Sequence, residues 1–185
     1  MAKLQPPLRR KIDALLQDLG VDPALIDARG LPLHEDAIEL VVAEVGDDGK
    51  EHQLVPDAAA QWTCLKEAAD REGVAIFVAS AFRSFDRQVE VVRSSIAAGR
   101  SVAAVFQHIA PPGCSEHHTG RALDLGTPGC ADLSDSFAQT DAFDWLEQNA
   151  GRFGFRLSFP PDNPWGYTYE PWHWCYTNSE HDADT

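Results

Sequence analysis

Apolar residues recur with a helical period in several segments of the chain. Within residues 8–19, four apolar side chains fall on one face of a helix that Gly20 would end: Ile12, Leu15, Leu16 and Leu19. The same spacing, together with residues that favour helix ends, predicts four more helices. They begin at Pro56, near Ser84, at residue 102 and after Thr140.

Strand patterns are shorter, and most of them come late in the chain. Residues 37–45 predict a strand that turns back through residues 46–49 toward Leu54. The continuously apolar residues 74–79 are typical of a strand buried on both faces. Further short strands are predicted at residues 121–125, 155–158, 165–168 and 172–176. Residues 21–36 are rich in Pro, Gly and Asp and predict a loop.

Helices that come mainly early and strands that cluster late predict an α+β fold: a small central antiparallel sheet flanked by helices in one domain. We expect residues 1–55 to form an N-terminal helix and hairpin extension packed on this domain. Residues 56–178 would form the domain itself, and residues 179–185 a frayed acidic tail.

Composition narrows the possible functions. The chain has 185 residues, of which 44% are hydrophobic, enough to bury a core. Its formal net charge of −14 disfavours nucleic acid as a partner, because phosphate backbones would repel it. No apolar run approaches the length of a membrane span. The N-terminus lacks the apolar segment of a signal peptide, so we expect a cytoplasmic protein, or a periplasmic one if a leader has been removed.

Four cysteines lie at positions 64, 114, 130 and 175. In a chain without an export signal, free thiols are expected rather than a disulfide framework. A pairing of Cys114 with Cys130 stays open, as does the oligomeric state of the protein.

Three segments carry residues that could support chemistry. Residues 80–88 follow a predicted strand, lead into a helix and contain Arg83. Residues 111–126 contain the pair His117-His118 after a Pro-Gly turn, and then Asp124 on an otherwise apolar strand. Residues 169–176 place Glu170 three positions before His173, whose side chain would lie on the strand face opposite the neighbouring tryptophans. Three aromatic residues are candidates for pocket walls or for core packing: Trp165, Tyr167 and Trp172.

Two histidines and one aspartate form a ligand set that catalytic zinc uses, with the fourth position left open for water. A neighbouring glutamate could then accept a proton from that water. Two other interpretations remain. Cys114 and Cys175 with His117 and His173 could close a structural zinc site. Alternatively, either cysteine could act as a nucleophile beside a histidine.

The residue pattern resembles the VanY-type zinc D-alanyl-D-alanine carboxypeptidases. Residues 115–124 read Ser-x-His-x-x-Gly-x-Ala-x-Asp, and residues 170–173 read Glu-Pro-Trp-His. Residues 80–84 are similar to the family's Ser-Gly-Tyr-Arg-Ser, although Ala81 and Phe82 replace its glycine and tyrosine. The similarity runs from about residue 56 to residue 176, with the three motifs in family order.

This resemblance implies the fold of the Hedgehog and D-Ala-D-Ala-peptidase proteins, and it implies roles for individual residues. His117, Asp124 and His173 would bind one zinc ion per chain. Glu170 would be the general base, and Arg83 would contact the substrate and stabilise negative charge on the scissile carbonyl. Ser115 and Gln88 would help to hold the terminal carboxylate of the peptide, while His118 would not be a ligand.

The implied activity is removal of the terminal D-alanine from peptidoglycan stem peptides or precursors that end in D-Ala-D-Ala. Three alternatives stay open: L,D-carboxypeptidase activity, endopeptidase activity on stem peptides, and a non-catalytic zinc domain that binds such peptides. Loss of the tyrosine hydroxyl at Phe82 bears on substrate contacts and leaves the zinc ligands intact.

Overall fold

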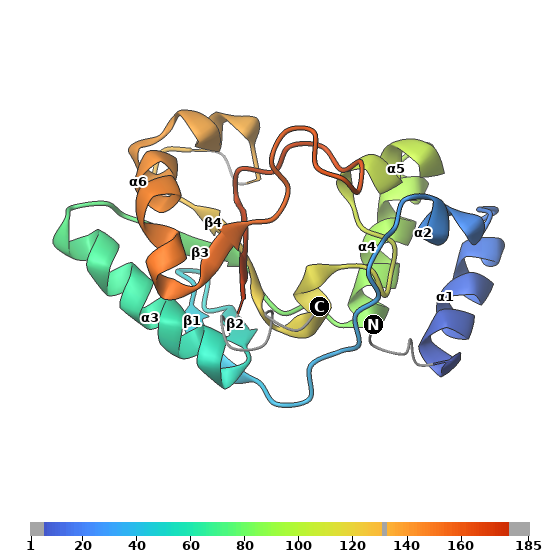
Figure 1. Cartoon of the computed structure of the whole chain (residues 1–185), viewed down its shortest axis with the longest axis horizontal. Helices are drawn as coiled ribbons and strands as arrows, with labels where there is room; N and C mark the ends of the chain where they lie inside the picture. The colour runs from blue at the N-terminus through green and yellow to red at the C-terminus, as the bar shows by residue number, and fades with distance from the viewer. Residues whose placement is uncertain (1–5, 131–132, 178–185) are drawn as a thin grey trace.

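The computed structural model describes residues 6–130 and 133–177, and it shows the predicted α+β fold (Figure 1). The described α-helices are α1 (Pro6–Asp18), α2 (Ala24–Ala28), α3 (Pro56–Arg71), α4 (Phe85–Ala97), α5 (Val102–His108) and α6 (Asp141–Asn149). Short 3-10 helices are η1 (Glu116–Thr119), η2 (Asp135–Gln139) and η3 (Ala150–Phe153). None of the helices in the described segments combines the length and apolarity required to span a bilayer.

Two antiparallel sheets accompany these helices. A hairpin pairs β1 (Val41–Val45) with β2 (Glu51–Leu54). The central sheet has the strand order β3-β4-β6-β5, with β3 (Phe77–Ser80), β4 (Ala122–Gly126), β5 (Phe155–Leu157) and β6 (His173–Tyr176). Every neighbouring pair in it is antiparallel. Strands β4 and β6 are therefore interior, and all of their residues are buried.

Local sequence signals explain most of the helix ends. Pro56 lies in the first turn of α3. The hydroxyls of Ser84, Ser101 and Thr140 accept hydrogen bonds from backbone N–H groups in the first turns of α4, α5 and α6. Beyond α1, Gly20 adopts a positive φ of 73°. These helices confirm the sequence predictions.

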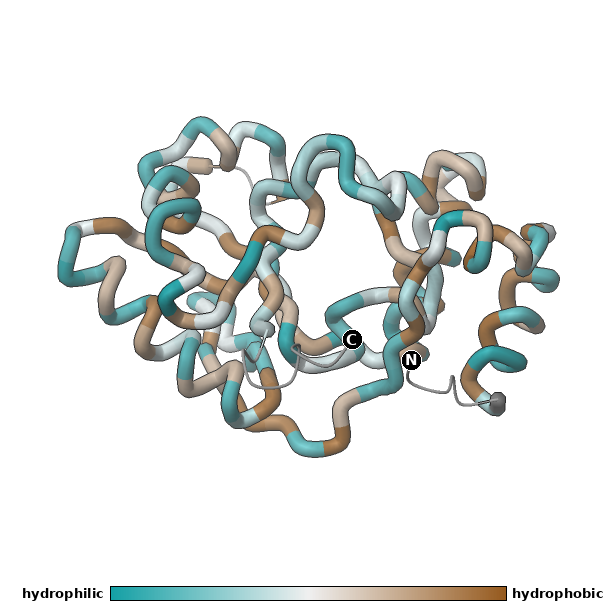
Figure 2. The backbone as a smooth tube through the Cα atoms, viewed as in Figure 1, coloured by the Kyte–Doolittle hydropathy of each residue, from teal (hydrophilic) through white to brown (hydrophobic). Residues whose placement is uncertain are grey.

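Apolar residues form two separate cores. One core packs α3 and α6 against the central sheet, with Trp62, Leu65, Leu123 and Trp174 among its buried members. The other packs α1 and α2 against α4 and α5, around Ile12, Leu16, Val92 and Phe106. Figure 2 shows the matching alternation of hydrophobic and hydrophilic residues along the helices, as expected for helices that bury one face.

Several predicted elements differ from the observed ones. The loop predicted at residues 21–36 contains α2, a single short turn of helix that buries only Ile26 and so gives no repeating pattern. No strand forms at residues 165–168, because Gly166 has a positive φ and its N–H donates to the carbonyl of Asn163 in a turn. Strand β3 is an edge strand and is only partly buried, and β1 begins at Val41 rather than at residue 37. The predicted tail at residues 179–185 lies outside the described residues.

Gly113 allows α1 to pack closely against the loop that precedes η1. Gly113 has a φ of 88°, and a Cβ atom there would overlap the side chain of Ile12 in α1. A larger residue at this position would push α1 away from the loop. The close contact therefore ties the N-terminal segment to the chain that leads into Ser115 and His117.

Candidate metal centre and groove

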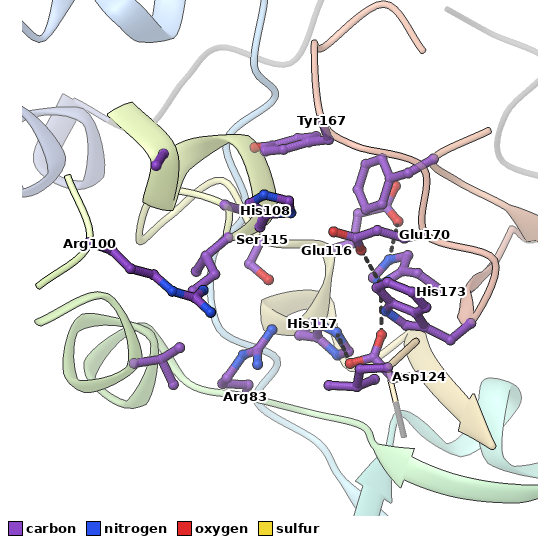
Figure 3. A pocket seen from close by; sticks show the side chains of 17 residues that line it. Arg83, Arg100, His108, Ser115, Glu116, His117, Asp124, Tyr167, Glu170 and His173 are labelled. Carbon is purple, nitrogen blue, oxygen red and sulfur yellow. Dashed lines mark hydrogen bonds and ion pairs between the residues drawn. The ribbon is translucent and has the colours of Figure 1, made fainter. Parts of the chain in front are cut away.

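Three side chains from separate segments converge between the two cores (Figure 3). His117 comes from η1, Asp124 from the middle of β4, and His173 from the first position of β6. The register of the sheet pairs Asp124 directly with His173. Alternation along β6 then turns Trp174 into the core and leaves His173 on the opposite face, beside Asp124.

One possible ligand atom from each of the three residues lies within 4.8 Å of the other two, in agreement with the convergence predicted from the sequence. His117 Nε2 is 3.1 Å from Asp124 Oδ2, and His173 Nδ1 is 3.0 Å from Asp124 Oδ1. A tetrahedral ion with bonds of about 2 Å holds its ligand atoms roughly 3.3 Å apart. Two imidazole nitrogens and one carboxylate oxygen at these separations fit the ligand set of a catalytic zinc ion.

Hydrogen bonds orient the two imidazole rings. His117 Nδ1 donates to the carbonyl of Ala81 at 2.7 Å, so its Nε2 faces Asp124 with a lone pair available. His173 Nε2 lies 3.0 Å from Glu116 Oε2, and because an ionised carboxylate can only accept, the ring donates from Nε2. Both rings therefore present their remaining nitrogen toward the same point.

The charges of the three residues are mutually dependent. Burial disfavours the Asp124 carboxylate, but the adjacent His117 and His173 hold the pKa of Asp124 well below its usual range. Burial lowers the pKa of His117, which favours its neutral form. Burial also opposes a charged His173, yet hydrogen bonds to Asp124 and Glu116 raise its pKa to about 10. A protonated His173 balances the negative charge of Asp124, and a cation bound here would take over that role.

Glu116 is a site residue that sequence reasoning missed. Its carboxylate is buried, bonds His173, and lies 3.6 Å from Arg156 Nη2. Burial opposes its ionised form, but the contact with His173 lowers its pKa to about 2. The available signal was its place inside the quoted motif, between Ser115 and His117, where a carboxylate needs a partner.

Glu170 lies beside His173 and faces the groove that runs past the three residues. Its Oε2 is 3.9 Å from His173 Nδ1, and its side chain is only 12% exposed. Burial raises the pKa of Glu170 to about 7. A carboxylate with a pKa near neutrality can both accept and return a proton.

Arg83 enters the same groove from the loop between β3 and α4. Its N–H donates to the carbonyl of His117 at 3.2 Å, and its own carbonyl accepts from His118 Nδ1 at 2.6 Å. His118 Nε2 in turn accepts from the N–H of Gly113, and burial lowers the pKa of His118 to about 4. His118 therefore positions the Arg83 backbone as a neutral ring and does not join the cluster of possible ligands.

The groove has a volume of about 720 Å³. Arg83, Ser115 and Glu170 line it, together with Tyr167 and Trp172, which also pack against the cores. Trp165, the third aromatic candidate, packs against a core and is not among the lining residues of the groove. Arg100 and His108 also line it, which the sequence did not indicate. In Figure 3, Arg83 and Arg100 lie on the side of the groove opposite His173 and Glu170.

Gln88 lies behind the groove rather than in it. Its side chain is fully buried in α4, and Nε2 donates to the carbonyl of Ala110 at 2.6 Å. Ala110 lines the groove, whereas Gln88 is not among its lining residues. The structure thus gives Gln88 a supporting contact to the wall, and the predicted contact with a substrate carboxylate finds no support in its position.

Within the described segments, no cysteine sulfur belongs to the cluster. Cys114 packs in the core formed by α1, α2, α4 and α5, and burial raises its pKa to about 12. Burial also raises the pKa of Cys175, whose Sγ contacts the Tyr176 carbonyl. Among the described residues, Cys114 is a free thiol, so it does not pair with Cys130. The closed cysteine–histidine zinc site and the thiol nucleophile are both disfavoured.

Comparison with known proteins shows which family the sequence matches. Residues 51–179 match the family described as VanY, D-alanyl-D-alanine carboxypeptidase. A D-alanyl-D-alanine carboxypeptidase of Enterococcus faecalis is 32% identical over 126 residues, which make up 63% of this chain and 45% of that protein. The chain therefore spans less than half the length of that curated relative.

Solved structures share the fold. The LD-carboxypeptidase LdcB matches with a TM-score of 0.68 at 29% identity, over 78% of this chain and 71% of that one. The vancomycin resistance D,D-pentapeptidase VanY, in complex with Zn(II), matches with a TM-score of 0.62 at 31% identity, over 81% and 84%. VanYB in complex with D-alanine-D-alanine matches with a TM-score of 0.61 at 30% identity, over 80% of this chain and 82% of that one.

Proposed function

Because the chain belongs to the VanY family of D-alanyl-D-alanine carboxypeptidases, we propose that it is a zinc enzyme that removes the terminal D-alanine from peptidoglycan stem peptides or their precursors. One observation carries the proposal: the buried cluster of His117, Asp124 and His173 opens onto a groove that also holds a protonatable Glu170. The Zn(II) complex of VanY and the D-alanine-D-alanine complex of VanYB support the metal and the substrate class.

His117, Asp124 and His173 would hold the metal in this proposal, through Nε2, a carboxylate oxygen and Nδ1. A bound zinc ion would supply Lewis acidity, which lowers the pKa of a water molecule to about 7 and polarises a carbonyl. The chain itself fixes the ligands in advance, since Ala81 and Glu116 orient the two rings before any ligand arrives.

Glu170 and Arg83 would perform the remaining steps of hydrolysis. Glu170, with a pKa near 7, accepts the proton of the attacking water and passes it to the leaving amine. Arg83, across the groove, stabilises the oxyanion that develops on the scissile carbonyl, a kind of interaction worth about 3–4 kcal/mol for one donor. Ser115 supplies a hydroxyl to the groove for the terminal carboxylate of the peptide.

A tetrapeptide is a second candidate substrate. The fold matches the LD-carboxypeptidase LdcB with a TM-score of 0.68, against 0.62 for the D,D-pentapeptidase VanY. An L,D-carboxypeptidase would use the same ligands and the same base on a tetrapeptide that ends in a single D-alanine. An endopeptidase would instead cut within the stem.

Mass spectrometry of stem peptides separates these activities. We expect the zinc-loaded protein to carry one zinc per chain and to release D-alanine from pentapeptides, and we expect chelation to abolish the release. Release from tetrapeptides alone would indicate L,D-activity, and internal cleavage would indicate an endopeptidase. Tight peptide binding with no cleavage would overturn the enzymatic proposal.

The first variant to make is Glu170→Ala. It should retain zinc, because Glu170 is not one of the three ligands, and its kcat should fall about 10²–10⁴-fold through loss of the proton acceptor. Glu147→Ala, an exposed change on α6, serves as the control. Full turnover by Glu170→Ala would remove the proposed base.

A further inference from the structure

A loop of twelve residues forms one wall of the groove. This strap (residues 159–170) leads from the end of β5 to the start of β6, and its base is closed by the Glu170 N–H, which donates to the Phe159 carbonyl at 3.1 Å. In Figure 1 the orange-red chain before β6 arches from the central sheet toward α5. Phe159, Tyr167 and Glu170 all line the groove, so the position of the strap helps to set the groove's shape.

The strap is held together internally by a buried asparagine. Asn163 Nδ2 donates to the carbonyls of Pro160 and Tyr167 at 3.1 and 2.8 Å, and Asn163 Oδ1 accepts from the N–H of Tyr167 at 3.2 Å. These bonds fix the conformation of the strap's tip. They do not fix where the tip lies relative to α5, so that position depends on contacts with other elements.

Arg29, at the end of α2, connects the tip of the strap to α5. Its Nε donates to the Trp165 carbonyl and its Nη1 to the Phe106 carbonyl, both at 2.7 Å. The guanidinium also lies 4.5 Å from the centre of the Tyr167 ring. One planar group thus bridges the strap and α5, and such charge-assisted bonds are stronger than bonds between neutral groups.

Ring contacts connect the tip of the strap to His173. The Phe159 ring packs against Trp165 at 5.9 Å and Tyr167 at 5.0 Å between centroids, and against the His173 ring at 4.7 Å. A strap released from α5 would therefore disturb the wall of the groove next to His173 and Glu170.

Arg29 lies outside residues 51–179, the part of the chain that matches the family. We propose that Arg29 is a positioning residue: it fastens the strap to α5, and the N-terminal segment thereby completes the peptide-binding wall of the groove. The structural part of this inference stands alone, whereas its kinetic part rests on the proposed function.

Hydrogen exchange tests the structural part without any substrate. The Thr168 N–H donates to the Gln107 carbonyl of α5 at 3.0 Å, so it reports the contact between strap and helix. In Arg29→Met, we expect exchange at Thr168 to become at least tenfold faster while exchange at Leu125 in β4 is unchanged. Arg10→Met, which removes an exposed charge from α1, should leave both rates unaltered. Equal acceleration at both amides would indicate general destabilisation and overturn the inference, as would no acceleration at Thr168.

Peptide kinetics test the functional part. For the zinc-loaded enzyme, we expect Arg29→Met to raise KM for the stem peptide about tenfold, with kcat changed less than threefold and with zinc content unaltered. The KM of Arg29→Lys should fall between the values of the wild type and Arg29→Met, because a single ammonium cannot reproduce the planar guanidinium. An unchanged KM in Arg29→Met beside an active wild type would overturn the inference. If the wild type cleaves no peptide, the proposed function fails, and exchange at Thr168 still decides the role of Arg29.

Discussion

Glu116 shows how a residue that is not itself a ligand can set the properties of a ligand. It accepts the Nε2 proton of His173, and this fixes which nitrogen of that ring faces Asp124. Carboxylate partners of this kind raise ligand basicity and hold the ring in place.

Replacing Glu116 by glutamine should weaken zinc binding about 10–100-fold, because the neutral amide is a poorer acceptor for the His173 proton. Competition with a zinc-binding dye measures this affinity. Glu147→Gln, on the exposed face of α6, is the matched control. Equal zinc affinity in Glu116→Gln and wild type would mean that the contact does not orient the ring.

His34 should contribute to the pH dependence of stability. Burial lowers the pKa of His34, so the folded protein takes up this proton at a lower pH than the unfolded chain, which accepts it below about pH 6.5. The unfolded state then binds more protons, and the free energy of unfolding falls as the pH drops through that range. In His34→Gln this loss should be smaller. Urea titrations at pH 7.5 and pH 5 compare the two proteins, and an equal loss in both would contradict the assignment.

At the residue scale, sequence reasoning found groups whose spacing matches a motif and missed groups that act through tertiary contacts. His117, Asp124, His173, Glu170 and Arg83 were identified, and the fold brings them to one groove. Phe159 and Arg29 belong to no motif, and their contacts join segments far apart in the chain. Gln88 has its expected position in the motif, but the helix turns its amide into the protein interior.

At the scale of elements, helices with a full apolar face were predictable, and short or edge elements were not. The helices α1, α3, α4 and α6 each carry two or more turns of repeating apolar residues or a clear cap. By contrast, α2 is five residues long, and residues 165–168 have strand-like composition but lie in the strap, where Asn163 imposes a turn. Local hydrogen bonds from a side chain to the backbone override strand propensity there.

Glu44 in β1 joins three elements, and its loss should destabilise the fold. Its carboxylate accepts from Trp62 Nε1 and Lys66 Nζ of α3, and from the N–H of Val78 in β3. Glu44→Ala should lower the free energy of unfolding by about 1–3 kcal/mol, since buried donors lose their acceptor. Urea denaturation measures the effect, with the exposed Glu51→Ala in β2 as control. Equal stability of the two variants would show that water replaces the carboxylate without cost.

At the scale of the molecule, the candidate metal centre lies between two cores that are otherwise separate. The groove beside it is lined by Phe159 and Tyr167 of the core around α1, α2, α4 and α5, and by Trp172, which packs against the core at the central sheet. A ligand that binds at this junction holds both sides together, so metal occupancy should be visible in global stability.

Removal of zinc should lower the melting temperature by about 5–10 °C if the ion is present at about one hundred times its dissociation constant. Scanning calorimetry of the zinc-loaded and chelator-treated protein measures the shift. Added zinc should restore the original melting temperature, and magnesium should not, because it prefers oxygen ligands. An unchanged melting temperature after verified zinc loss would show that the centre does not contribute to the fold.

The pairing of Asp124 with His173, and of Leu123 with Trp174, limits how the chain can change in length. One inserted residue within β6 would exchange the two faces of the strand, so that a tryptophan would meet Asp124 and the histidine would enter the core. A single-residue insertion or deletion there would abolish metal site and core packing together. Side chains in the strap do not alternate between two faces, since its turns are held by Asn163 and Arg29 rather than by a strand ladder. Libraries that vary loop length in search of new peptide preferences should therefore diversify the tip of the strap and leave the inner strands intact.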